Sequence, residues 1–180
     1  GGEIKVMCSG AFTAAYQELL PVFERATNHT ILTTFGASMG NTPNSIPNRL
    51  QRGEPADVVV LAGPALDELI RNGKAVAGSR VDLGRSHIGL AVRTGAPKPD
   101  ITTADALKRT LLAAKSIAYS SSASGVYISN ELLSRLEIAD QVAGKSRRIE
   151  GEMVGAVVAR GEAEIGFQQI SELLPISGID

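Results

Sequence analysis

The chain has 180 residues, of which 43% are hydrophobic and 21% charged, and its formal net charge is −1. This composition is typical of a globular protein, and a near-zero charge without any basic run argues against a nucleic-acid-binding protein. No apolar run reaches the roughly 18–20 residues of a membrane span, so we expect a chain that does not itself cross a membrane.

The first 84 residues alternate strand and helix patterns. Apolar and β-branched runs predict strands at 3–7, 29–35 and 57–62, and helical spacing with capping signals predicts helices at 10–26, 46–52 and 64–73. The third strand has an unbroken apolar run and is predicted to be buried. Cys8, the single cysteine, excludes an internal disulfide and is interpreted as a buried, inert thiol. A βαβαβα order predicts a parallel sheet with helices on both faces.

A second α/β unit follows. The strand at 86–93 leads into a turn segment at 94–99, after which patterns predict helices at 103–113, 124–136 and 153–158 and strands at 116–120, 147–150 and 164–167. The fold class predicted is therefore α/β with two lobes, 1–84 and 85–180. Each lobe is expected to hold a mostly parallel sheet flanked by helices, with a ligand cleft between the lobes.

Polar loops follow the predicted strands, where ligands bind in doubly wound sheets. They lie at residues 8–10, 36–45, 120–127 and 166–169, and are rich in hydroxyls, glycines and amides. Such donors suit an oxyanion or a carboxylate, because each charge-assisted hydrogen bond contributes about 1.5–3 kcal/mol. The alternative is that these residues only cap helices and form turns.

Three segments carry a family resemblance: Arg52-Gly53-Glu54-Pro55-Ala56-Asp57-Val58-Val59, Ser122-Ala123-Ser124-Gly125-Val126-Tyr127 and Ala159-Arg160-Gly161-Glu162-Ala163-Glu164-Ile165-Gly166. With them the chain resembles the mature periplasmic solute-binding proteins of the molybdate-binding type, the receptors of ABC importers. The resemblance implies a two-lobed protein that closes over an anion, a periplasmic location after removal of a signal peptide, and importer membrane subunits as partners. It also implies that the chain crosses back to the first lobe near the end of the second lobe, and that a C-terminal segment then completes the first lobe.

The same resemblance implies where the ligand binds. Ser9 and Ser38 correspond to the hydroxyls that receive the oxyanion in the first lobe, and the backbone around Ser124 and Gly125 corresponds to the donors in the second. The predicted ligand-binding residues are Ser9, Gly10, Ser38, Met39, Asn41, Thr42, Arg49, Ser122, Ser124, Gly125, Val126, Tyr127, Gln168 and Gln169. Metal-ligand spacing is absent, and we expect neither a metal nor a cofactor.

The chain departs from the molybdate pattern at two places. Gln168 and Gln169 stand where those receptors have a tyrosine, and the loop after the second strand is longer, with Arg49 behind it. Arg49 can offer a bidentate fork to a carboxylate, or can be an ordinary surface arginine. A subgroup that includes a bacterial aconitate isomerase, which shifts a proton across an allylic system without a cofactor, is similar to this chain in four segments: Ser38-Met39-Gly40, Ile46-Pro47-Asn48-Arg49-Leu50, Ser122-Ala123-Ser124-Gly125-Val126-Tyr127 and Gly166-Phe167-Gln168-Gln169. The resemblance implies a di- or tricarboxylate ligand. A receptor is favoured, and an isomerase is the alternative.

No residue stands out as a catalytic base. His29 and His87 are interpreted as structural, and Tyr127 as a packing or hydrogen-bonding residue that can also exchange a proton. The pattern Gly36-Ala37-Ser38-Met39-Gly40 matches a hydrolase nucleophile elbow. That motif requires a helix to begin at the serine, whereas residues 41–47 delay the helix, so a hydrolase is not favoured.

Overall fold

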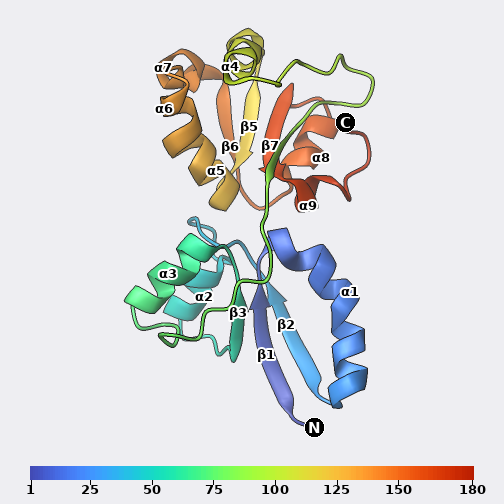
Figure 1. The fold of residues 1–180 in the computed structure, drawn as a ribbon, viewed down its shortest axis with the longest axis vertical. Helices are drawn as coiled ribbons and strands as arrows, with labels where there is room; N and C mark the ends of the chain where they lie inside the picture. Colours follow the sequence, from blue (N-terminus) through green and yellow to red (C-terminus); the bar gives the residue numbers. More distant parts are fainter. The chain divides into compact units, whose positions relative to one another are not determined.

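The computed structural model describes all 180 residues and divides them into two compact units, Gly1–Arg85 (unit 1) and Ser86–Asp180 (unit 2) (Figure 1). Each unit contains its own sheet. None of the helices is long and apolar enough to cross a membrane.

Unit 1 is a three-stranded parallel sheet in the order β2-β1-β3. Its strands are β1 (Glu3–Cys8), β2 (Thr30–Phe35) and β3 (Val58–Val60), and its helices are α1 (Gly10–Thr27), α2 (Ile46–Gln51) and α3 (Gly63–Arg71). Cys8 pairs with Phe35 on one side and with Val60 on the other. The three strands therefore end at the same level, and the loops that follow them start from one edge of the sheet.

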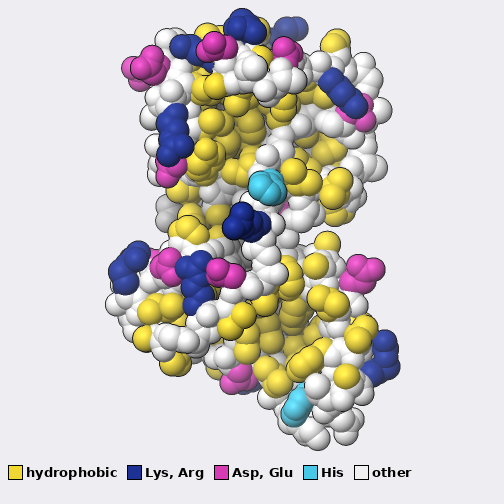
Figure 2. Space-filling model, viewed as in Figure 1, with side chains coloured by type: hydrophobic (Ala, Val, Ile, Leu, Met, Phe, Trp, Pro, Cys, Tyr) yellow, Lys and Arg dark blue, Asp and Glu magenta, His cyan; other side chains and the backbone are white.

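The core of unit 1 is thin. Buried apolar side chains come from the sheet and from α2 and α3. Helix α1 has no buried residue. It packs on β2 through Tyr16, whose hydroxyl lies 2.6 Å from the hydroxyl of Thr33. The prediction that the third strand is buried was wrong: β3 is an edge strand, and Val58 is 47% exposed. Figure 2 shows hydrophobic side chains gathered over this sheet.

Unit 2 is a four-stranded sheet in the order β4-β7-β5-β6, in which only β4 is antiparallel. The strands are β4 (Ile88–Ala91), β5 (Ile117–Ser120), β6 (Ser146–Ile149) and β7 (Ile165–Gln169). The α-helices are α4 (Ala104–Ala113), α5 (Ala123–Tyr127), α6 (Leu133–Arg135), α7 (Ala139–Val142), α8 (Val154–Ala159) and α9 (Ile170–Leu173), with a π-helical segment, Ile128–Leu132, and a 3₁₀ turn, Ala143–Lys145. The predicted helix at 124–136 is therefore α5 and α6 joined through the π-helical segment.

Apolar clusters cover both faces of the unit 2 sheet. One includes Leu111, Ile117 and Phe167, and the other joins Ala118 to the valines of α8. Gly166 allows α8 to pack directly on β7, because a Cβ there would lie 2.6 Å from Val158 and 2.8 Å from Val154. The last residues also belong to this unit, since Asp180 and Val92 exchange two backbone hydrogen bonds of 2.9 Å. Unit 2 is thus the better packed of the two.

Candidate anion-binding edges

The buried polar side chains of both units collect at the carboxyl ends of the strands. They are Ser9, Ser38 and Ser45 in unit 1, and Ser120, Ser124 and Gln168 in unit 2. Each lies at the end of a strand or in the segment that follows it. Because a buried polar group must be hydrogen-bonded, the partners of these six show which of them have capacity left for a ligand.

In unit 1, hydrogen bonds join the three loops. The Ser9 N–H donates to the carbonyl of Val60 at 2.8 Å, and the Ala62 N–H donates to the Ser38 hydroxyl at 2.9 Å. Ser38 therefore lies against the loop between β3 and α3. Its oxygen accepts this bond, so its own proton remains available to an anion. The Ser9 hydroxyl does not cap α1.

The loop between β2 and α2 is held from within. A Cβ on Gly36 would lie 2.0 Å from the carbonyl oxygen of Asn44, so only glycine permits this approach. The Asn48 side chain donates to the carbonyl of Thr42 at 2.8 Å, and the buried Ser45 hydroxyl caps α2. The side chains of Met39 and Thr42 are partly buried and that of Asn41 is exposed. Because α2 begins eight residues after Ser38, the nucleophile elbow does not form.

Arg49 has protein partners on two edges of its guanidinium. Its Nε donates to the carbonyl of Asn44 at 3.0 Å, and its Nη1 forms an ion pair with Glu54 at 3.1 Å, with the side chain only 16% exposed. The contact with Asn44 holds the loop between β2 and α2, and the contact with Glu54 joins α2 to the segment that precedes β3. The structure thus gives Arg49 a positioning role, and its proposed role as a carboxylate fork remains a prediction.

Replacing Arg49 with alanine is expected to lower the free energy of unfolding of unit 1 by about 1–2 kcal/mol, because two hydrogen bonds of a partly buried guanidinium are lost. Amide hydrogen exchange in residues 36–45 should accelerate. Arg71→Ala is the matched control, since its pair with Glu68 is exposed and contributes little. Unchanged exchange in the loop would contradict the positioning role.

In unit 2, the loop after β5 is wound tightly. The hydroxyls of Ser120 and Ser124 share a hydrogen bond of 3.0 Å, and the Ser122 N–H donates to Ser120 at 3.2 Å. A Cβ on Gly125 would lie 1.5 Å from the carbonyl oxygen of Ser120. The Ser122 hydroxyl forms no cap on α5. Among the other predicted residues, Gly10 begins α1, and Val126 and Tyr127 at the end of α5 are both 37% exposed.

Gln168 is bonded at both ends of its amide. Its carbonyl accepts from the N–H of Val154, the first residue of α8, at 2.9 Å, and its Nε2 donates to Glu172 at 2.9 Å. Tyr119 pairs with Phe167, so Ser120 lies level with Gln168 on neighbouring strands. Gln169 accepts a hydrogen bond of 2.5 Å from the hydroxyl of Ser86. Both predicted amides thus have protein partners.

Sequence reasoning missed Glu172, which lies in α9 directly after β7. Burial raises the pKa of its carboxyl to about 7, and the hydrogen bond from Gln168 only partly opposes that change. The elements that pack most closely against α9, which are β4, β7 and α8, carry no titratable side chain. A helix of four residues is too short for periodicity to mark its faces, so no sequence signal indicates this burial.

The other titratable candidates have structural surroundings. His29 accepts a hydrogen bond from the backbone of Gly2 at 3.0 Å, near the start of the unit 1 sheet, and the carbonyl of His87 accepts from Ile170. Burial raises the pKa of Cys8 to about 11, so its thiol stays protonated at neutral pH. No group of three or more histidines, cysteines or acidic residues could hold a metal ion.

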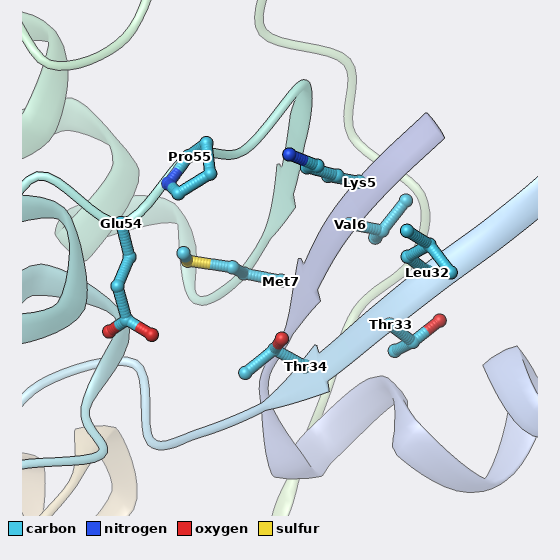
Figure 3. Close-up of a pocket in the computed structure, with 8 residues that line it drawn as sticks. All are labelled: Lys5, Val6, Met7, Leu32, Thr33, Thr34, Glu54 and Pro55. Atoms are coloured by element: carbon cyan, nitrogen blue, oxygen red, sulfur yellow. The ribbon is translucent and has the colours of Figure 1, made fainter. Parts of the chain in front are cut away.

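A shallow hollow of about 230 Å³ lies on the face of the unit 1 sheet. Figure 3 shows Met7 and Thr34 on neighbouring strands beside the segment that carries Glu54 and Pro55. None of the predicted ligand-binding residues lines it. The carboxyl edges, with their buried hydroxyls, are therefore the better candidates for an anion site.

Comparison with known proteins gives a family match over nearly the whole chain. Residues 4–179 match the family described as bacterial extracellular solute-binding protein. The chain is 52% identical to an aconitate isomerase from Pseudomonas sp over 177 residues, which are 98% of this chain and 68% of that protein. It is 29% identical to the molybdate-binding protein ModA from Azotobacter vinelandii over 176 residues, 95% of this chain and 66% of that protein.

The fold is also found among solved structures. The substrate binding domain of a putative molybdenum ABC transporter from Clostridium difficile superimposes with a TM-score of 0.68 at 20% identity, covering 100% of this chain and 76% of that domain. The predicted α/β fold of periplasmic-binding-protein type is thereby confirmed. The chain spans about two thirds of the length of the two curated relatives.

Proposed function

The chain belongs to the bacterial extracellular solute-binding protein family, and from this premise we propose that it binds a small carboxylate anion through donors at the carboxyl edges of its two sheets. The observation that carries the proposal is the collection of all six buried polar side chains at those edges. Hydroxyl and amide groups can hold an anion through hydrogen bonds, without a positively charged side chain beside it. Delivery of the anion to an ABC importer in the periplasm is part of the same proposal.

A carboxylate is favoured over a metal oxyanion because the relative with the higher identity is an aconitate isomerase, and aconitate is a carboxylate. Identity is 52% to the aconitate isomerase and 29% to the molybdate-binding protein. We therefore take di- and tricarboxylates of the size of aconitate as the first ligands to test, and molybdate as the competing one.

A second candidate function is isomerisation of aconitate. It is favoured by the 52% identity to an aconitate isomerase, which extends over 98% of this chain. Such a reaction moves one proton between two carbons of an allylic system and requires a proton-transfer group close to both. Binding of the same anion is common to the receptor and the enzyme.

The binding proposal is tested by thermal shift with molybdate, tungstate, sulfate, citrate, cis-aconitate and trans-aconitate. A ligand present at about 1,000 times its Kd stabilises a protein by about 4 kcal/mol, so the correct anion should raise the Tm clearly. We expect the tricarboxylates to do so. A flat response to every anion would contradict the proposal, and a response to molybdate alone would change the ligand class.

Replacing Ser9 with alanine is expected to weaken binding of the stabilising anion about tenfold to a hundredfold, because a hydrogen bond to a charged ligand contributes about 1.5–3 kcal/mol. The fold should be unaffected, since this hydroxyl does not cap α1. Isothermal titration calorimetry measures the affinity. Ser134→Ala, an exposed serine outside the loops, should bind as the wild type does, and an equal loss in both variants would contradict the role of Ser9.

Proton NMR of trans-aconitate mixed with the protein separates the two candidate functions. Appearance of cis-aconitate would identify an isomerase, whereas binding without conversion would leave a receptor. The two measurements are independent, because thermal shift reports binding whether or not the ligand reacts.

A further inference from the structure

Glu172 is a carboxyl group placed among the donors of unit 2 with no cation beside it. Its Oε2 accepts from Gln168 at 2.9 Å, it forms no ion pair, and its side chain is partly buried. Most other glutamates of this unit lie at the exposed surface, several of them paired with arginines. A carboxyl kept partly out of water without a counter-charge is costly unless it carries a proton.

We propose that Glu172 is the acid–base group of this protein, taking a proton from a bound tricarboxylate of the aconitate type and returning it to another carbon. The inference rests on the second candidate function and deepens it. Glu172 is then a catalytic residue, and Gln168 is the residue that positions it.

The geometry places Glu172 at the edge that carries the candidate anion donors. Gln168 links the carboxyl to the first N–H of α8 through bonds of 2.9 Å at each end of its amide. Ser120 stands level with Gln168 on the adjacent strand and shares its own hydroxyl bond with Ser124. The carboxyl is therefore bonded to a side chain whose residue stands level with Ser120, at the start of the serine loop expected to hold the ligand.

The chemistry of the carboxyl suits a group that both accepts and donates a proton. Its pKa is raised to about 7 by burial, so both protonation states are populated near neutral pH. The elements that pack most closely against α9, which are β4, β7 and α8, hold no titratable side chain to compete for that proton, and His87, whose carbonyl accepts from Ile170, is exposed. Gln168 holds Oε2, which leaves Oε1 to exchange the proton.

The step is balanced without any other reactant. The carboxylate takes a proton from the methylene carbon of aconitate, and the C–H electron pair forms a new double bond to the central carbon. The electron pair of the old double bond shifts to the far carbon, which takes the proton back from Glu172. One C–H bond breaks, another forms, and neither an oxidant nor a reductant is needed.

The test uses the whole chain with trans-aconitate in D₂O, followed by proton NMR, with binding measured separately by calorimetry. We expect the wild type to convert the substrate and Glu172→Gln to do so at least about 100-fold more slowly, with affinity changed less than about threefold. Glu172→Asp should recover part of the rate. The wild-type rate at low substrate should rise through about pH 7, where the base form appears.

Glu131→Gln serves as the matched control, because Glu131 is an exposed carboxyl of the same unit and should leave the rate unchanged. A wild-type rate in Glu172→Gln would overturn the proposal. So would a wild-type protein that binds trans-aconitate but neither converts it nor incorporates deuterium, and in that case the binding proposal would stand. Absence of binding would overturn both.

Discussion

Replacing Gly125 with alanine is expected to destabilise unit 2 by about 3 kcal/mol or more, a cost at the upper end of overpacking substitutions. A Cβ there would lie 1.5 Å from the carbonyl oxygen and 2.5 Å from the carbonyl carbon of Ser120. Both atoms belong to the backbone, so no side-chain rotation relieves the clash. In the interior of an ordinary helix, replacing glycine with alanine stabilises the protein by about 0.5–1 kcal/mol. The cost of the clash at Gly125 is expected to outweigh that gain.

Differential scanning calorimetry measures the loss, which for a unit of this size corresponds to a fall in Tm of about 12 °C or more. Gly144→Ala is the matched control, because a Cβ at Gly144 would meet no atom within 4 Å. The ligand response should also disappear in Gly125→Ala, because the backbone movement that relieves the clash displaces the bonded hydroxyls of Ser120 and Ser124. Equal stability of the two variants would contradict the close packing of this loop.

The alternation of strands and helices was enough to predict the fold and the edge on which the polar loops lie. Parallel strands bring their carboxyl ends to one edge, so Ser9, Ser38 and Ser124 could be placed there before any coordinates. The structure finds all three buried at those positions. Periodicity and connection rules are local. They predict at which end of the strands the polar loops lie, but they do not predict the hydrogen-bond partners of each side chain.

What the sequence could not predict depends on tertiary surroundings. The apolar run of β3 is compatible with a central or an edge strand, and only the sheet order shows that it lies at an edge. Arg49 was interpreted from its residue type, whereas its contacts with Asn44 and Glu54 arise from the fold of the loop. The raised pKa of Glu172 is caused by burial, which no pattern in a four-residue helix indicates.

The partners of Gln168 also change the interpretation of the unit 2 edge. Sequence reasoning placed both glutamines among groups that contact the ligand, yet the Gln168 amide is 4% exposed and bonded to Val154 and Glu172. A ligand that reached the N–H of Val154 would have to displace the Gln168 carbonyl. A ligand bound at that N–H would therefore also move the side chain that holds the Glu172 carboxyl.

The stability of unit 2 is expected to fall as the pH rises from about 4.5 to about 7. Glu172 has a folded-state pKa of about 7 against an ordinary value of 4.5, so in this window the folded state binds a proton that the unfolded state releases. The difference corresponds to about 3 kcal/mol, which partial exposure reduces to about 2 kcal/mol. The stabilisation is complete below pH 4.5 and lost above pH 7.

Glu172→Gln should remove this dependence, because glutamine keeps an acceptor for Gln168 and does not ionise. We expect the variant to match the wild type near pH 4.5 and to exceed it by about 2 kcal/mol at pH 8, as measured by urea unfolding and by hydrogen exchange in β5 and β7. Glu131→Gln should follow the wild-type profile. If the wild type and Glu172→Gln lose stability in parallel between pH 5 and pH 8, the carboxyl is ionised throughout, and Glu172 is then not the proton-carrying group of this edge.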